Sequence, residues 1–114
     1  MAFNEIELAR IDKLVGSLCR KIPEHVRHEL RHTYVVEGHS VMMFEERPGW
    51  DDPSEWTQMG IAKFRYFRSR GEWKLYWMRR DLKWHEYDPE VSKSRSLEKL
   101  VKIVEEDKWG AFYG

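Results

Sequence analysis

The stretch MGIAKFRYFRSRGEWKLYWMRR, residues 59–80, predicts a β-hairpin in the middle of the chain. On both sides of Arg70 and Gly71, apolar residues alternate with charged ones, as in strands that bury one face. We expect Arg70 and Gly71 to form a two-residue turn, which would pair Tyr66 with Leu75. A slip of one residue would mix apolar and charged side chains on one face, so their clean separation supports this pairing.

The predicted hairpin sorts its side chains into two faces of different chemistry. The face expected to be buried carries Ala62, Phe64, Tyr66, Trp73, Leu75 and Trp77. The face expected to be exposed carries Lys63, Arg65, Phe67, Lys74, Tyr76, Met78 and Arg80. An apolar sheet face needs a covering layer, which the rest of the chain must supply.

Two amphipathic helices flank the strands and can provide that layer. The first begins at Asn4, which forms a capping box with Glu7, and continues as an apolar stripe at helical spacing. The second begins at Ser94 or Ser96 and ends at Gly110. Both helices are expected to lie on the apolar face of the sheet.

Further strands are predicted over residues 33–46, as a hairpin that turns at 37–40, and over residues 83–87. The order is then helix, five strands, helix. We predict one α+β domain over residues 1–114. Its antiparallel sheet of about five strands is built from hairpins and is covered on one face by the N- and C-terminal helices.

The composition also indicates one small folded domain. Among 114 residues, 35% are charged and 14% are aromatic, and six tryptophans argue against disorder. Twenty basic and twenty acidic residues balance, so attraction to nucleic acid or membrane must come from local asymmetry. The sequence has one cysteine and shows neither a signal-peptide pattern nor an apolar run of membrane-spanning length. These features favour a cytoplasmic protein without a membrane partner.

Four stretches of the sequence carry a family resemblance. They are VEGHSVMMFEERPGWDDPSEWT (36–57), AKFRYFRSRGEWKLYWMRRD (62–81), KWHEYDP (83–89) and WGAFYG (109–114). From about Tyr34 onward the chain resembles a family of small uncharacterised bacterial proteins, the domain-of-unknown-function family 3024. Leu82 stands where the resemblance leads us to expect the glycine of an Asp-Gly turn, so that turn should be longer or less tight. The resemblance supports a single domain and implies no activity, cofactor or partner.

The exposed face of the hairpin has the chemistry of a nucleic-acid platform. Its candidate binding residues are Lys63, Arg65, Phe67, Lys74, Tyr76 and Arg80. Cations can bind phosphates, and aromatic rings between them can stack on bases. We expect weakly sequence-specific binding of a single strand, or binding of another anionic partner such as an acidic protein.

The same face supports other interpretations. Basic side chains with long aliphatic stems can simply cover apolar surface, and the zero net charge favours this solvated face. Exposed Phe67, Tyr76 and Met78 near arginines also have the composition of a protein interface, which a homodimer could bury. The oligomeric state as a function of salt would distinguish these cases.

An acidic loop is the second candidate site. Asp51, Asp52 and Glu55 lie between Trp50 and Trp56, and three carboxylates could hold a cation or supply a base. The alternative is that Asp52 and Glu55 cap a short helical turn. The two tryptophans would then anchor the loop to the core.

The sequence favours a binding module over an enzyme. It contains no nucleophile elbow, glycine-rich phosphate loop or paired-cysteine motif, and we predict neither a cofactor nor a metal site. His25, His28 and His32 have ligand-like spacing only if one helix runs through all three. His32 is expected in a strand, which removes that spacing.

Overall fold

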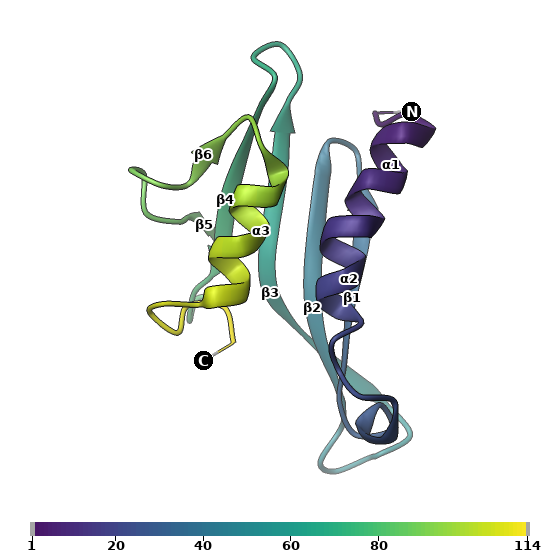
Figure 1. Cartoon of the computed structure of the whole chain (residues 1–114). Coiled ribbons are helices and arrows are strands. Elements are labelled where there is room, and N and C mark those ends of the chain that lie inside the picture. The colour runs from purple at the N-terminus through teal and green to yellow at the C-terminus, as the bar shows by residue number, and fades with distance from the viewer. Residues whose placement is uncertain (1, 114) are drawn as a thin grey trace.

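The computed structural model describes residues 2–113 and has the predicted α+β architecture (Figure 1). Six strands form one sheet in the order β1-β2-β3-β4-β5, with every pair antiparallel, and the short β6 pairs with β4 beside β5. The strands are β1 (Arg31–Glu37), β2 (Ser40–Pro48), β3 (Trp56–Phe67), β4 (Glu72–Met78), β5 (Trp84–Glu86) and β6 (Lys93–Ser94).

The N-terminal helical run starts at the predicted capping box. The Glu7 backbone N–H donates to Asn4 Oδ1 at 2.8 Å, and the Asn4 N–H donates to Glu7 Oε1 at 3.0 Å. The run is not α-helical throughout, because a π-helical segment interrupts it, which the sequence did not indicate. Its parts are α1 (Glu5–Ile11), the π-helical η1 (Asp12–Gly16), α2 (Ser17–Cys19) and, after Pro23, the 3₁₀ turn η2 (Glu24–Val26).

The last helix, α3 (Leu97–Glu106), begins at Ser96, whose hydroxyl accepts from the Lys99 N–H at 3.4 Å. It ends before the predicted Gly110, because Asp107 takes a left-handed conformation with φ +43°. The Asp107 carboxylate then accepts backbone N–H groups from two of the last described residues. This carboxylate therefore fastens the C-terminal segment beneath the end of α3.

Both helices cover the same face of the sheet. Figure 1 shows α1 in front of β1 and β2, and α3 in front of β3 and β4. The fully buried side chains of the core come from both helices and from the three central strands: Ile11, Val15, Val41, Met43, Ala62, Phe64, Leu75, Leu100 and Val104. The opposite face of the sheet has no helix over it within residues 2–113.

The β3–β4 hairpin keeps the predicted faces but not the predicted register. Tyr66 pairs with Trp73 instead of Leu75, and Phe67 closes the hairpin opposite Glu72. The turn therefore has four residues, 68–71, instead of two. A shift of two residues leaves every side chain on its predicted face, because side chains alternate with a period of two. Trp73 and Leu75 are buried as predicted, whereas Tyr66 and Trp77 pack against the core and are only partly buried.

A β-bulge interrupts the β2–β3 pairing. The register shifts between Met43, which pairs with Ala62, and Phe44, which pairs with Gly60. Gly60 lies where a Cβ atom would come within 2.7 Å of Met78 Cε and 2.8 Å of the Trp84 ring. Glycine here lets these two large side chains close over the strand.

Two predictions for the loop between β2 and β3 are wrong. Residues 49–55 form turns and no helical turn. Trp50 does not anchor the loop, because its side chain is 95% exposed. Trp56 is partly buried, but its partner is Arg31, whose guanidinium carbon lies 3.9 Å from the Trp56 ring centroid, and neither belongs to the core.

The turn after β4 is long, as expected from Leu82. Met78 pairs with Trp84, so five residues, 79–83, connect β4 to β5. Leu82 holds φ +61°, the left-handed conformation in which glycine is favoured. Its side chain is 66% exposed and makes no contribution to the core.

Candidate functional site on the open face of the sheet

The sheet face turned away from α1 and α3, which we call the open face, carries five of the six predicted binding residues. β3 contributes Lys63, Arg65 and Phe67, and β4 contributes Lys74 and Tyr76. Lys63 lies directly opposite Tyr76, and Arg65 lies directly opposite Lys74. Their chain neighbours on the other face are core residues, so strand alternation alone directs these five side chains outward.

Cations surround the aromatic rings of this face. Three of them approach Phe67: the Arg65 guanidinium carbon at 5.0 Å from the ring centroid, that of Arg70 at 4.6 Å, and Lys74 Nζ at 5.3 Å. Lys63 Nζ lies 5.6 Å from the Tyr76 ring centroid. Such cation–π contacts hold the charges over partly buried rings. We call these six residues the basic–aromatic patch: Lys63, Arg65, Phe67, Arg70, Lys74 and Tyr76.

Carboxylates neutralise the patch only in part. Glu86 Oε1 lies 3.8 Å from Lys74 Nζ. Within residues 2–113, no carboxylate oxygen lies within 4.0 Å of the charged nitrogens of Lys63, Arg65 or Arg70. The patch therefore presents positive charge although the chain as a whole is neutral. Burial raises the pKa of the Tyr76 phenol, which is uncharged at neutral pH even without this shift.

Arg80 does not join the patch. It lies in the turn after β4 and lines a hollow of about 640 Å³ together with Trp77, Asp81 and the segment at Gly110 and Ala111. The prediction placed Arg80 on the open face by extending strand alternation beyond the end of the strand. β4 ends at residue 78, so the alternation no longer applies.

The basic residue Arg68 also points away from the open face. Its Nη2 donates to the Ala2 carbonyl at 2.5 Å and to Glu7 Oε1 at 3.0 Å, which ties the tip of the hairpin to the start of α1. The hydrogen bond from Arg68 is the main reason why the pKa of Glu7 lies below its usual range. Arg68 is therefore a structural residue.

The acidic loop does not assemble a site. Asp51, Asp52 and Glu55 are all exposed, and Asp52 Oδ1 accepts from the Ser54 hydroxyl at 2.6 Å and from the Ser54 N–H at 3.1 Å. These bonds from Ser54 lower the pKa of Asp52. Asp52 thus accepts a backbone N–H as predicted, but in a turn.

The three histidines and the acidic residues do not assemble a metal-binding cluster within the described part of the chain. Among residues 2–113, no group of three His, Cys, Asp or Glu side chains is arranged to hold a metal ion. His25 lies in η2, His28 follows in a turn, and His32 lies in β1. The histidine spacing is therefore not carried by one helix.

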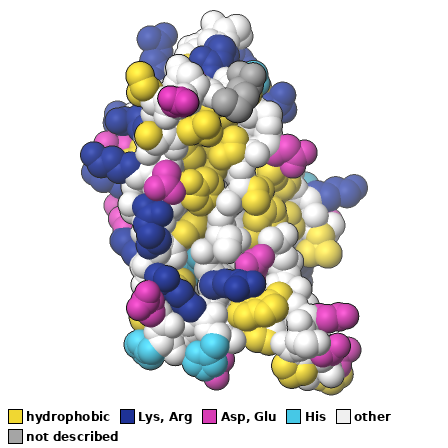
Figure 2. Space-filling view, turned by 90° about the vertical axis from the view of Figure 1, so that its right-hand side faces the viewer, with side chains coloured by type: hydrophobic (Ala, Val, Ile, Leu, Met, Phe, Trp, Pro, Cys, Tyr) yellow, Lys and Arg dark blue, Asp and Glu magenta, His cyan; other side chains and the backbone are white. Residues whose placement is uncertain are grey.

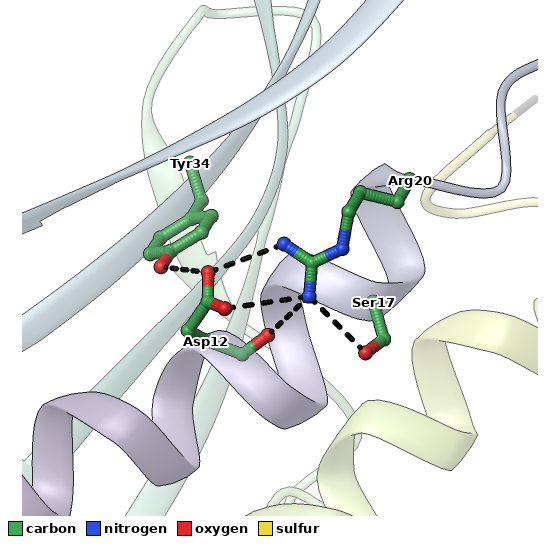
Figure 3. Close-up of polar contacts among 4 residues, drawn as sticks. All are labelled: Asp12, Ser17, Arg20 and Tyr34. Atoms are coloured by element: carbon green, nitrogen blue, oxygen red, sulfur yellow. Dashed lines mark hydrogen bonds and ion pairs between the residues drawn. The ribbon is translucent and has the colours of Figure 1, made fainter. Parts of the chain in front are cut away.

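A polar cluster that sequence reasoning missed joins η1 to β1 (Figure 3). The Tyr34 hydroxyl donates to Asp12 Oδ1 at 2.7 Å, and the Arg20 guanidinium reaches both Asp12 oxygens at 3.3 Å and Ser17 Oγ at 3.4 Å. The bond from Tyr34, followed by that from Arg20, holds the pKa of Asp12 below its usual range. Burial and the bond to Asp12 raise the pKa of Tyr34 to about 12.

Gly16 makes this cluster possible. A Cβ atom on residue 16 would lie 2.5 Å from Asp12 Oδ1 and 2.9 Å from an Arg20 amino nitrogen. The ion pair therefore crosses the helix surface directly over the glycine. Each of the four side chains binds at least one other member of the cluster, so we interpret it as a link between helix and sheet. Burial raises the pKa of the nearby Cys19 thiol to about 11, which disfavours a reactive thiolate.

Comparison with known proteins places the chain in a family. The family model described as domain of unknown function (DUF3024) matches residues 3–114. The chain belongs to the DUF3024 family. No curated protein and no solved structure matches the chain. The family confirms the resemblance read from the sequence and assigns no chemistry to the open face.

The helix-covered side of this DUF3024 chain also carries unpaired basic residues, which provide a control for the patch. Arg10 and Arg95 are exposed and line a groove of about 340 Å³ between α1 and the start of α3, above Tyr66 and Trp73. Within residues 2–113, neither arginine has a carboxylate oxygen within 4.0 Å. In the same part of the chain, no helix is both long and apolar enough to cross a membrane.

Proposed function

We propose that the basic–aromatic patch binds single-stranded nucleic acid. One observation carries this proposal: three cations surround Phe67 on a sheet face that no described helix covers. Antiparallel sheets that expose aromatic and basic side chains bind unpaired strands because bases splay over the rings while phosphates meet the cations. In this proposal the protein acts in the cytoplasm, which fits its single buried cysteine.

The two kinds of side chain in the patch have different roles in this proposal. Lys63, Arg65, Arg70 and Lys74 bind phosphates, and the release of counterions supplies most of the affinity. The ring of Phe67 or Tyr76, or the guanidinium plane stacked on it, offers a surface to a base. Each stacked base contributes about 1–3 kcal/mol.

Binding should depend only weakly on base sequence. Base edges are read mainly by bidentate side chains such as Asn, Gln and Arg held in fixed positions. The sequence contains one asparagine, Asn4, and one glutamine, Gln58. Asn4 is occupied in the capping box and Gln58 donates to Glu46, so neither lies in the patch. The arginines of the patch are held over Phe67 instead.

The test is a fluorescence-anisotropy titration of a labelled single-stranded oligonucleotide at two salt concentrations. We expect binding at low salt that weakens steeply as salt increases. Arg65→Ala/Lys74→Ala should weaken binding and reduce the slope of log affinity against log salt by about 0.7 for each phosphate that the variant no longer neutralises.

The matched control is Arg10→Ala/Arg95→Ala, which removes the same charge from the helix-covered side. This pair should leave the affinity nearly unchanged. Equal losses in the two double variants would show that binding follows net charge alone, and absence of binding at low salt would also exclude the proposal.

A protein partner of the same face is the second candidate. Beside the patch, the open face continues into an apolar group. In it, the rings of Phe44 and Trp84 pack edge to face with their centroids 6.4 Å apart, and the Met78 side chain lies over Gly60. An acidic protein or a second copy of the chain could bury this group and neutralise the patch. Tyr76→Glu should then release monomers without unfolding the chain, as measured by light scattering.

A further inference from the structure

The two edges of the sheet are built differently. On the β4 side, the edge is closed by the short strands β5 and β6. Between them, the Leu75 N–H donates to the Ser92 carbonyl at 2.8 Å, and the Leu75 carbonyl accepts from the Tyr87 N–H at 3.0 Å. On the other side, β1 is the terminal strand, and among the residues that the structure describes it pairs along all seven residues with β2 alone. Short strands protect an edge from further pairing, whereas a long regular strand exposes it.

The register fixes which backbone groups of β1 face outward. The His39 carbonyl accepts from the Tyr66 N–H at 2.8 Å, so odd-numbered positions at this end of β2 face β3 and even-numbered positions face β1. Glu37 and Ser40 flank the two-residue turn and form a hydrogen-bonded pair. Because such pairs alternate, the N–H and C=O groups of His32, Tyr34 and Val36 are directed at the free edge.

Nothing within β1 blunts this edge. Its sequence, RHTYVVE, contains no proline, glycine or lysine, and the bulge of the sheet lies between β2 and β3. Val35 and Val36 are 44% and 37% exposed on opposite faces of the strand. Figure 2 views the molecule from the side of α1 and β1 and shows apolar side chains gathered in two neighbouring strips along the middle of this surface.

We propose that β1 pairs antiparallel with β1 of a second copy of the chain, around a twofold axis at Tyr34. This register uses the whole strand and places each outward-directed residue opposite another: His32 opposite Val36 of the partner, and Tyr34 opposite Tyr34 of the partner. It thereby satisfies all the free N–H and C=O groups of the three residues. The two sheets would join into one.

Charge complementarity favours a second copy of the chain as the partner of the β1 edge. In this register Arg31 of one copy lies opposite Glu37 of the other, twice in the dimer and on the same face. Arg31 uses its Nε–H to bind Glu46 at 2.9 Å, so its terminal amino groups remain available. Thr33 lies opposite Val35, which is a favourable pair of β-branched residues. The basic–aromatic patch lies on β3, on β4 and in the turn between them and stays accessible, so this dimer is independent of the proposed function.

The first experiment measures self-association of the full chain by sedimentation equilibrium. Val36→Pro removes an outward N–H from each copy, and the absence of two hydrogen bonds per dimer should weaken association about tenfold or more. Val36→Thr keeps the N–H and the β-branch and should associate like the original chain. Circular dichroism and thermal melting check that both variants are folded. A monomer at all concentrations in the unchanged chain would overturn the proposal.

Cysteine cross-linking tests the register. Directly opposite residues of a pair without mutual hydrogen bonds have Cα atoms about 4.5 Å apart, which suits a disulfide. Thr33→Cys mixed with Val35→Cys should therefore give a cross-linked dimer under mild oxidation, whereas each variant alone should not. Cys19 is buried, and the unchanged chain serves as its control. Cross-linking of either variant alone, or none in the mixture, would contradict the proposed pairing.

Discussion

At the scale of single residues, the backbone conformation of Leu82 and the hydrogen bonds of Asp12 each have a measurable effect on stability. Leu82 is the clearer case, because an exposed leucine occupies φ +61° in the turn between β4 and β5. An L-residue in this region is strained by about 1–2 kcal/mol, and glycine loses about 0.5–1 kcal/mol in chain entropy. We expect Leu82→Gly to raise the free energy of unfolding by about 0.5–1 kcal/mol in urea denaturation.

The control for this prediction is Leu82→Ala. Alanine removes the exposed side chain but keeps the Cβ atom, and so the strain. The free energy of unfolding should therefore not increase. An equal increase in both variants would mean that loss of exposed apolar surface, and not the backbone conformation, is responsible.

Asp12 makes stability depend on pH in the acid range. Its pKa in the folded chain is lowered by the bonds from Tyr34 and Arg20, so the folded state favours the carboxylate. This contribution is fully present above the pKa of Asp12 in the unfolded chain and is lost as pH falls through the lower pKa of the folded chain. Asp12→Asn should therefore be less stable than the original chain at neutral pH, with a difference that shrinks towards low pH.

Thermal melting between neutral and acid pH measures this effect. Asp12 and Arg20 are half-exposed, so added salt should reduce it. Tyr34→Phe removes the first donor to Asp12 and should bring the pH dependence partway to that of Asp12→Asn. A difference that stays constant over the whole pH range would contradict this role of Asp12.

At the scale of elements, alternation predicted the faces of the strands better than their pairing. Every residue assigned to a face of the β3–β4 hairpin within the strands lies on that face, although the register is shifted by two residues. The turn length could not be predicted, because Arg68 leaves the strand to bind Glu7 of α1 and the Ala2 carbonyl that precedes this helix. Contacts between distant segments decided where the hairpin closes.

Gly60 gives a prediction at the same scale. A Cβ atom there would meet Met78 and Trp84 at less than 3.0 Å, and the indole ring has little freedom to move away. Gly60→Ala should lower the free energy of unfolding by about 1–3 kcal/mol through overpacking. Urea denaturation measures this loss, which comes from the contacts of the added methyl group because Gly60, unlike Gly38 at φ +58°, does not have a positive φ. A fully stable Gly60→Ala would show that the open face can relax around the extra methyl group.

At the scale of the whole molecule, the layered architecture followed from the sequence and the loops did not. Helix caps, apolar stripes and alternation were enough for two helices on one face of an antiparallel sheet. The prediction that Trp50 anchors its loop was wrong, because an aromatic residue in a loop is buried only if the loop folds back onto the core. The Asp12 cluster depends on the π-helical segment and on the close approach of Asp12 and Arg20 to Gly16. Neither feature can be predicted from the pattern of a single sequence.

The proposed binding patch also belongs to this scale, because its charge is visible only when the two sides of the sheet are compared. The sequence predicted six residues on this face, of which the structure brings five together and leaves Arg80 out, while the geometry of the four-residue turn adds Arg70. The chain is neutral overall, but its free cations on β3 and β4 lie on the face that the helices leave open. We propose that the position of these cations, and not the net charge of the chain, governs the binding of nucleic acid.

The most direct test of this central claim is an NMR titration of the labelled chain with a single-stranded oligonucleotide at low salt. We predict chemical-shift changes concentrated on β3 and β4, at Lys63, Arg65, Phe67, Lys74 and Tyr76, with little change on α1 and α3. Shifts concentrated around Arg10 and Arg95 on the helix-covered side, or no shifts at all, would contradict it.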